Sequence, residues 1–277
     1  MSRPFQNQIV LITGSTDGIG KQAAIQLAQQ GLTVLLHGRN EQKGKQIARE
    51  IKQQTGNQNV DFFQADLASL QQVRQLAAAV KKQYEQVHVL INNAGVFEPS
   101  FRRGEDGFEM TFTVNHLAHF LLTCLLLDHL CQSAPARIIN VASMAHSHEL
   151  DFQNLQGERH YSGYTAYAYS KLANILFTFK LARMLDKNKI TVNCLHPGVI
   201  NTKLLHAGWG LGGTSPEQGA HILTYLATSP DVDGVTGKYF YEMQGPAKPA
   251  AIAYDEQVQD RLWQLSEQWT MCKFMAC

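Results

Sequence analysis

Short apolar runs alternate with amphipathic segments along most of the chain. Several runs are apolar at consecutive positions, as in parallel strands that are covered by helices on both faces. Between the runs, apolar residues recur every three or four positions, for example from Leu70 to Tyr84, which predicts amphipathic helices. The pattern predicts seven strands, within residues 8–14, 32–38, 59–65, 88–95, 136–143, 190–198 and 237–243.

This alternation predicts right-handed βαβ units and an α/β fold with a doubly wound, mostly parallel seven-stranded sheet and helices on both faces. The 277 residues contain no linker and no internal repeat, so residues 1–277 are expected to form a single domain. A last amphipathic pattern, from Val258 to Trp269, predicts a helix near the end of the chain.

The charge balance argues against nucleic acid as a partner. Lys and Arg number 24 and Asp and Glu 23, giving a net charge of +1 without a basic cluster. The five cysteines show no metal-binding spacing, and they are expected to be buried or free thiols in a reducing compartment.

The N-terminal segment runs almost directly into the first apolar strand, leaving no room for a signal peptide. The longest apolar stretch, residues 120–130, contains Asp128 and His129 and is too short to cross a bilayer. We therefore expect a cytoplasmic protein without a membrane span.

A glycine-rich turn follows the first predicted strand. The segment LITGSTDGIG places Gly14, Gly18 and Gly20 between this strand and a helix that starts near Ile19. Glycine allows the sharp turn and a close approach of the backbone to a pyrophosphate, which the positive end of the helix then attracts. The context favours a dinucleotide site of the Rossmann type over a turn without a ligand.

Arg39 stands at the end of the second predicted strand, 19 positions after Gly20. An NAD-selective site carries an acid near this position, whereas a guanidinium suits the 2′-phosphate of NADP. The sequence therefore favours NADP(H) over NAD(H), with a solvated arginine at a strand end as the alternative. Asp66, after the third strand, has two equally weighted interpretations, a contact with the adenine amino group or a residue near a helix N-cap.

Three tyrosines lie in the segment YTAYAYSK, residues 164–171, and one of them has a cationic neighbour. Tyr167 and Lys171 are four positions apart and share one face of a helix, whereas Tyr164 and Tyr169 have alanines four positions on. A nearby ammonium lowers a phenol pKa toward the range useful for acid–base catalysis. Tyr167 is the catalytic candidate, and Tyr164 and Tyr169 are expected to form cleft wall and packing.

Together these motifs resemble the short-chain dehydrogenase/reductase family over nearly the whole chain. The matching segments are TGSTDGIG (13–20), NNAG (92–95), VNHLAHF with Asn115, NVAS with Ser143, YAYSK (167–171) and HPG (196–198). DGFEMTFTVNHLAHFLLT, NLQGE and YSKLANILF are similar to the retinol-dehydrogenase-like and carbonyl-reductase-like branch.

The resemblance implies a catalytic tetrad. Tyr167 would protonate a carbonyl oxygen, and Ser143 would hydrogen-bond the same oxygen. Lys171 would lower the tyrosine pKa and bond the nicotinamide ribose. Asn115 would anchor a water of a proton relay, which would explain an asparagine inside a helix, although a surface asparagine is the alternative.

The resemblance also implies a set of cofactor contacts. Asn93, Ala94 and Gly95 would line the cofactor, Pro197, Gly198 and Val199 would bracket the nicotinamide, and Thr202 would lie near its carboxamide. The complete set comprises Gly14, Ser15, Thr16, Asp17, Gly18, Ile19, Gly20, Arg39, Asn40, Asp66, Leu67, Asn93, Ala94, Gly95, Tyr167, Lys171, Pro197, Gly198, Val199 and Thr202.

The chain departs from the family pattern in three ways. Ser143 and Tyr167 are 24 positions apart, and the insert between them is expected to form one wall of the substrate cleft. NADPH-preferring members often carry a basic residue where this chain has Asp17, so the cofactor preference rests on Arg39 alone. Membrane-bound retinoid enzymes carry an N-terminal hydrophobic anchor, and none is expected in this chain. This difference weakens the expectation that a retinoid is the substrate.

Loops and apolar helices complete the expectations. Residues 201–216 combine glycines with Leu204, Leu205 and Trp209 and suit a flexible lid over an apolar substrate, with an ordinary glycine-rich loop as the alternative. His146, His148 and His160 are expected to be loop residues rather than metal ligands. The apolar segments 108–131 and 166–185 favour a homodimer or homotetramer, with burial inside one chain as the alternative.

The sequence thus predicts an NADPH-dependent oxidoreductase that reduces an apolar ketone or aldehyde reversibly. Within the same fold, the alternatives are a retinol or steroid dehydrogenase and a reductase of a pigment precursor. From another class comes a redox sensor that binds NADP(H) with little turnover.

Overall fold

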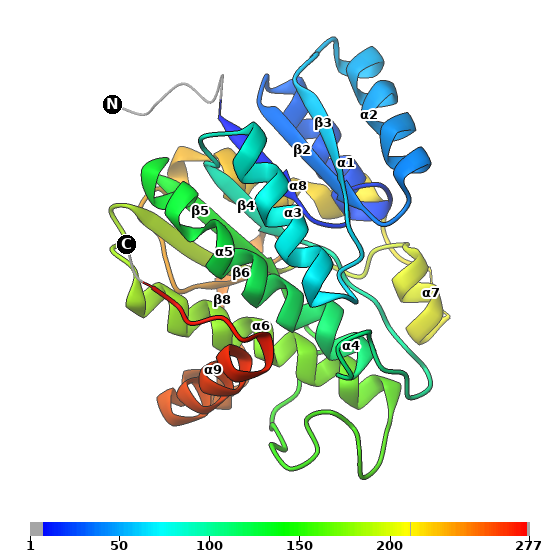
Figure 1. Cartoon of the computed structure of the whole chain (residues 1–277), viewed down its shortest axis with the longest axis vertical. Coiled ribbons are helices and arrows are strands. Elements are labelled where there is room, and N and C mark those ends of the chain that lie inside the picture. The colour runs from blue at the N-terminus through cyan, green and yellow to red at the C-terminus, as the bar shows by residue number, and fades with distance from the viewer. Residues whose placement is uncertain (1–7, 211, 276–277) are drawn as a thin grey trace.

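The computed structural model describes residues 8–210 and 212–275. Its eight strands form one sheet in the order β3-β2-β1-β4-β5-β6-β7-β8, in which β1 to β7 are parallel and β8 is antiparallel to β7 (Figure 1). The strands are β1 Ile9–Ile12, β2 Thr33–Gly38, β3 Val60–Gln64, β4 Val89–Asn92, β5 Ala136–Val141, β6 Ile190–His196, β7 Tyr239–Tyr241 and β8 Pro246–Ala247.

Each of the seven predicted segments contains a strand, and the Rossmann-type α/β fold is confirmed. Several strands end earlier than predicted, because the residues after Ile12, Asn92 and Val141 leave the sheet. The predicted number of strands was one too low. The additional strand β8 has two residues, too few for a periodic pattern, and its Pro246 lies at a sheet edge, where proline is tolerated.

Helices cover both faces of the sheet and create two apolar cores. Strand residues alternate between these cores, with Val10 and Ile12 in one and Leu11 in the other. On the first face lie α1 Gly18–Gln29, α2 Glu41–Thr55 and α8 Pro216–Thr228, and on the second lie α3 Leu70–Gln83, α5 Ala118–Gln132 and α6 Gly163–Met184.

The helix in front of α5 is wound irregularly. The short α4 (Met110–Phe112) continues into a π-helical turn, Thr113–Leu117, and then into α5, so that Met110–Gln132 is one continuous helix. Its length and composition would suffice to cross a membrane, which corrects the estimate from residues 120–130. However, 83% of its most apolar stretch is buried in the protein, as in a core helix.

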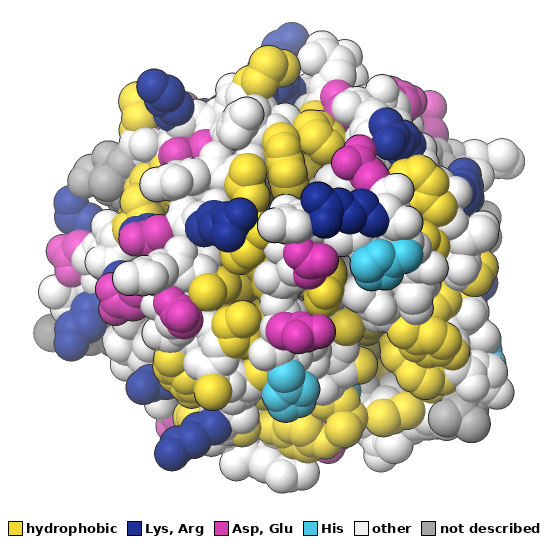
Figure 2. Space-filling view, turned by 90° about the horizontal axis from the view of Figure 1, so that it is seen from below, with side chains coloured by type: hydrophobic (Ala, Val, Ile, Leu, Met, Phe, Trp, Pro, Cys, Tyr) yellow, Lys and Arg dark blue, Asp and Glu magenta, His cyan; other side chains and the backbone are white. Residues whose placement is uncertain are grey.

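The C-terminal helix α9 (Glu256–Thr270) confirms the helix predicted there and covers α6 (Figure 1). The ring of Trp263 lies 5.1 Å from that of Phe120 and 5.8 Å from that of Phe177, measured between centroids. Figure 2 views the molecule from the side where α9 lies and shows charged side chains of both signs among the apolar ones. Many apolar side chains of α5 and α6 are buried within one chain, so their composition alone does not require an oligomer, and the homodimer or homotetramer stays a prediction.

The cysteines do not all carry free thiols. Cys124, Cys194 and Cys272 are free, whereas Cys131 is bonded in a disulfide, and Cys277 lies outside the described residues. The expectation of buried or free thiols was therefore wrong for Cys131, because sequence spacing does not reveal which cysteines meet in space.

Candidate active site

A cleft of about 1120 Å³ opens at the carboxyl ends of the central parallel strands. This is where open α/β sheets bind ligands. Nineteen of the twenty residues expected to contact a cofactor line this cleft, and Ser15 does not. The lining comprises Gly14, Thr16, Asp17, Gly18, Ile19, Gly20, Arg39, Asn40, Asp66, Leu67, Asn93, Ala94, Gly95, Tyr167, Lys171, Pro197, Gly198, Val199 and Thr202, together with Ser143.

 Among them, Thr202 is the N-cap of α7 (Lys203–Trp209).

The glycine turn is packed too tightly for side chains at two positions. Gly14 has φ +64°, and a Cβ there would lie 2.9 Å from the Cα of Ala94. A Cβ at Gly20 would lie 2.5 Å from the carbonyl oxygen of Gly14. The helix α1 starts at Gly18, close to the predicted start, and its first residues Gly18, Ile19 and Gly20 line the cleft. The Asp17 carboxylate accepts the N–H of Gly18, and a helix N-terminus at this place suits a phosphate.

Ser15 and His37 hold this turn from behind. Ser15 is fully buried, and its hydroxyl donates to the carbonyl oxygen of Ile12 over 2.9 Å, so the cofactor contact expected for Ser15 is replaced by a role inside the turn. The Nδ1 of His37 accepts a hydrogen bond from the backbone N–H of Gly14 over 3.1 Å. Burial lowers the pKa of His37 to about 4, so the ring is neutral at pH 7 and can accept this bond.

A second cation lies in the cleft near Arg39. Arg39 is exposed, and Lys43 of α2 lines the same end of the cleft. The Nζ of Lys43 lies 3.0 Å from the Asp17 carboxylate, and the Nζ of Lys203 lies 2.8 Å from it. Hydrogen bonds from Lys203 and Lys43 hold the pKa of Asp17 well below its usual range. The two lysines therefore offset the acidic residue in the glycine turn.

Asn40 is the N-cap of α2, whereas Asp66 lies in the turn before α3, whose N-cap is Ser69. The Asp66 carboxylate accepts a hydrogen bond from the backbone N–H of Ala68 over 3.0 Å, and Asn40 caps α2 through the N–H of Lys43. Both also line the cleft. The two interpretations of Asp66 are compatible, since a carboxylate can accept a backbone bond and retain lone pairs for a ligand.

The loop after β4 is tied to the glycine turn. The Thr13 hydroxyl accepts hydrogen bonds from the backbone N–H groups of Asn93 and Ala94, over 2.9 and 3.0 Å. The Asn93 side chain donates to the carbonyl oxygen of Thr13 over 2.8 Å. These bonds hold the loops after β1 and β4 together on one side of the cleft.

Ser143, Tyr167 and Lys171 meet on the other side. Ser143 follows β5, and Tyr167 and Lys171 lie one turn apart on α6, with the Lys171 Nζ 5.5 Å from the centroid of the Tyr167 ring. A hydrogen bond joins the side chains of Ser143 and Tyr167. The phenol, the hydroxyl and the ammonium thus converge at the cleft, although 24 positions separate Ser143 from Tyr167.

Burial controls the ionisation of this group. It raises the pKa of Tyr167 to about 12, against a smaller lowering by the bond with Ser143. It also lowers the pKa of Lys171 to about 8. Burial, and not Lys171, therefore determines the pKa of Tyr167 in the structure, because desolvation disfavours the charged form of each group.

Asn115 lies in the π-helical turn beneath the cleft and is fully buried. Its side-chain oxygen accepts from the N–H of Val96 over 2.8 Å, and its amide donates to the carbonyl oxygen of Val96 and to the Ser170 hydroxyl, each over 3.0 Å. The alternative of a surface asparagine is wrong. Asn115 therefore lies in a π turn inside a longer helix, and such turns often occur at functional sites.

Residues 201–216 contain α7 rather than loop throughout. The ends of the segment are joined by hydrogen bonds between Val199 and Thr214 and between Thr214 and Asn201, each of 2.9 Å. Gly198, before it, has φ +101° and gives the chain a sharp turn beside Pro197.

Aromatic side chains around Trp209, at the end of α7, connect this helix with the catalytic candidate Tyr167. The ring of Trp209 lies 5.3 Å from that of Tyr167 and 5.6 Å from those of Phe97 and Tyr164. The Tyr164 hydroxyl donates to the carbonyl oxygen of Gly208. Tyr164 thus supports the cleft-lining Trp209 from outside, because it is itself 54% exposed and does not line the cleft, whereas the buried Tyr169 packs in the core.

The histidines of the insert do not form a metal site within the described ranges, where no group of three or more His, Cys, Asp or Glu could hold a metal ion. His148 and His160 are exposed. His146 is half-buried and bonded on both ring nitrogens, to the carbonyl oxygen of Ser143 over 2.6 Å and to the N–H of Ala250 over 3.0 Å.

Sequence reasoning missed three residues at or beside this site: Lys43, His37 and Phe97. Lys43 follows the capping residue Asn40 by three positions, so it points from the same first turn, and this local spacing could have identified it. His37 and Phe97 have no comparable signal, because their roles depend on contacts between distant segments.

Comparison with known proteins agrees with this geometry. The family model described as short chain dehydrogenase matches residues 8–208. Human retinol dehydrogenase 13 is 45% identical over 271 residues, covering 92% of this chain and 82% of the relative. Human polyprenol dehydrogenase is 40% identical over 288 residues, covering 96% of this chain and 86% of the relative.

Solved structures share the fold. An uncharacterized protein from Mycobacterium paratuberculosis has a TM-score of 0.81 at 31% identity, covering 98% of this chain and 96% of that one. A short chain dehydrogenase from Escherichia coli CFT073, complexed with NADPH, has a TM-score of 0.72 at 28% identity, covering 87% of this chain and 99% of that one. The chain belongs to the short-chain dehydrogenase/reductase family of oxidoreductases, in its retinol-dehydrogenase-like branch.

Proposed function

We propose that the protein is an NADPH-dependent oxidoreductase that reduces the carbonyl group of an apolar ketone or aldehyde to an alcohol, reversibly. The observation that carries the proposal is the convergence of Ser143, Tyr167 and Lys171 at the end of a cleft that begins at the glycine turn. In the family, these residue types serve acid–base chemistry at a carbonyl oxygen.

The cleft fits a dinucleotide. The backbone at Gly14 and Gly20 leaves no space for a Cβ, and the start of α1 offers N–H groups for a pyrophosphate. Arg39 and Lys43 would hold a 2′-phosphate, and Pro197, Gly198 and Val199 would flank the nicotinamide. Once bound, the cofactor would supply the hydride.

The preference for NADPH over NADH rests on charge. A phosphate placed between Arg39 and Lys43 gains two charge-assisted contacts, which NADH cannot make. Asp17 would repel such a phosphate, but Lys203 and Lys43 offset its charge. The cofactor preference therefore depends on two cations rather than on Arg39 alone.

The protein's own residues would move the proton. Tyr167 is protonated at pH 7 because burial raises its pKa to about 12, so it can donate to the carbonyl oxygen. Ser143 would donate a hydrogen bond to the same oxygen and hold it near the phenol. The Lys171 ammonium would stabilise the phenolate that forms, and Asn115 would fix the helix turn behind it through Val96 and Ser170.

The substrate class follows from the wall of the cleft. Trp209, whose ring lies beside that of Tyr167, and Leu204 present apolar surface in the cleft, which suits an apolar substrate. The relatives named retinol dehydrogenase and polyprenol dehydrogenase make a long apolar alcohol, or the corresponding aldehyde, a specific candidate within this class.

The test is the absorbance of the reduced nicotinamide, followed with NADPH and NADH in parallel. The panel contains retinal, a polyprenal, apolar ketones, quinones and a small polar aldehyde. We expect oxidation of NADPH by at least one apolar carbonyl. NADPH that binds tightly but is not oxidised by any compound would instead favour a redox sensor.

A further inference from the structure

His196, the last residue of β6, is a buried imidazole without a hydrogen-bond partner. Its side chain is 3% exposed and lines the cleft, and within the described part of the chain neither Nδ1 nor Nε2 finds a donor or acceptor. Buried polar side chains are nearly always hydrogen-bonded, so two unpaired ring nitrogens require an explanation. His146 shows the usual case, with both of its nitrogens bonded to the backbone.

One side of His196 faces the catalytic candidates. Side chains alternate along β6, so His196 lies on the same face as Cys194, which packs in the core with α6. The charge of Lys171 acts on the His196 ring. Lys171 donates to the carbonyl oxygen of Val141, whose register partner is Leu195, the neighbour of His196.

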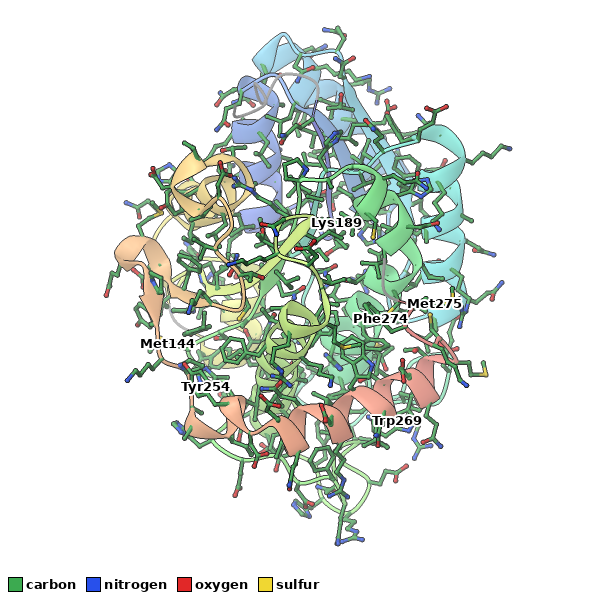
Figure 3. The ribbon with its side chains drawn as sticks, turned by 90° about the vertical axis from the view of Figure 1, so that its left-hand side faces the viewer. Met144, Lys189, Tyr254, Trp269, Phe274 and Met275 are labelled. Carbon is green, nitrogen blue, oxygen red and sulfur yellow. The ribbon has the colours of Figure 1, made fainter. Side chains whose placement is uncertain are left out.

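The other side leads toward the surface. His196 pairs with Tyr241 across the β6–β7 register, and their rings lie 5.0 Å apart. The Tyr241 hydroxyl lies 3.6 Å from the sulfur of Met144, a residue that is 50% exposed and lies at the edge of the molecule near Tyr254 in Figure 3. On the same strand as Tyr241, Tyr239 carries a buried hydroxyl that has no partner among the described residues, and its ring lies 5.6 Å from that of His146.

We propose that His196 is a proton-relay residue that connects Lys171 with solvent at Tyr241, with water bridging the intervals. The inference rests on the proposed carbonyl reduction. After Tyr167 has given its proton to the substrate oxygen, Lys171 returns one proton to the phenolate. His196 then passes one proton from solvent to Lys171, receiving it on one ring nitrogen and releasing it from the other.

The electrostatic surroundings suit this function. Burial, His146 and Lys171 together lower the pKa of His196 to about 4, so the ring is neutral at pH 7 and holds a proton on one nitrogen alone. A neutral imidazole can donate and accept at the same time. The relay moves one proton in each turnover, leaves His196 unchanged in charge and exchanges its tautomer, so the ring returns to the first tautomer by rotation or through water before the next turnover.

The experiment compares His196→Ala and His196→Gln with the wild type in steady-state NADPH oxidation, with and without added imidazole. We expect both variants to lower kcat by roughly 10- to 100-fold while NADPH binding stays close to that of the wild type. Imidazole should restore His196→Ala, which leaves space for it, and should not restore His196→Gln. His221→Ala, on the exposed face of α8, is the control and should leave kcat unchanged.

Two results would overturn the relay. In the first, both variants keep the kcat of the wild type. In the second, activity is lost together with NADPH binding and imidazole restores neither, which would make His196 part of the cofactor cradle. If His196→Ala does not fold, the solvent deuterium isotope effect on kcat of His196→Gln tests the relay instead. The relay requires this isotope effect to exceed that of the wild type, and an equal effect would overturn it. A wild type inactive toward every carbonyl would overturn the proposed function itself.

Discussion

The Nζ of Lys171 donates a hydrogen bond of 2.9 Å to the carbonyl oxygen of Val141, the last residue of β5. This bond fixes the position of the ammonium beside Tyr167, but it compensates for only part of the lost hydration. The pKa of Lys171 therefore falls from 10.5 to about 8. Lysine is charged below its pKa and neutral above it, so the charge beside Tyr167 disappears within the range of ordinary assays.

We predict that carbonyl reduction loses rate as the pH rises through about 8, because the ammonium that stabilises the Tyr167 phenolate and returns its proton is lost. Alcohol oxidation should show the opposite trend, since a neutral Lys171 can accept the proton. The measurement is kcat/KM from pH 6 to 10 in both directions. A flat profile for reduction across this range would contradict the role given to Lys171.

Tyr167→Phe should lower kcat by about 10²- to 10⁴-fold, because the variant lacks the proton donor but keeps the ring and its packing. NADPH binding should remain close to that of the wild type. Tyr169→Phe is the matched control on the same helix, since Tyr169 packs in the core. Equal activity of the two variants would show that another group acts as the acid.

Arg39→Asp and Lys43→Ala should both weaken NADPH binding, and NADH binding much less. The expected losses are about 100-fold for the charge reversal and roughly tenfold for Lys43→Ala, in line with hydrogen bonds to charged groups. Titration calorimetry with 2′,5′-ADP and 5′-AMP measures the phosphate contribution without turnover. Lys45→Ala is the control, because Lys45 is exposed and pairs with Glu41 on the same helix. Equal losses for 2′,5′-ADP and 5′-AMP would refute the phosphate site.

Trp209→Ala should raise KM for long apolar carbonyls by roughly tenfold, because the variant removes apolar surface beside Tyr167. A small polar aldehyde, which cannot reach this wall, should keep its KM. The comparison of the two substrates in the same variant separates loss of the wall from general damage to the site. Parallel increases for both substrates would argue against α7 as the apolar wall.

The sequence contained the sheet, the glycine turn and the catalytic candidates, because each depends on local spacing. Gly14 and Gly20 precede a helix, and Tyr167 and Lys171 lie one helical turn apart, so short distances along the chain place them. The contact between Trp209 and Phe97 could not be predicted, because it depends on how α7 packs against the loop after β4. Burial, too, is a tertiary property, which is why the pKa of Tyr167 rises where the sequence suggested a fall.

The packing of α9 over α6 also has a consequence for the order in which the protein is made. Trp263 contacts Phe120 and Phe177, which are synthesised more than eighty residues earlier. Until α9 leaves the ribosome, these rings lack their cover, and a nascent chain in this state exposes apolar surface that promotes aggregation. The helix α9 thus completes the fold only after the segments that it covers have been made, and chaperones that shield apolar surface are needed most in that interval.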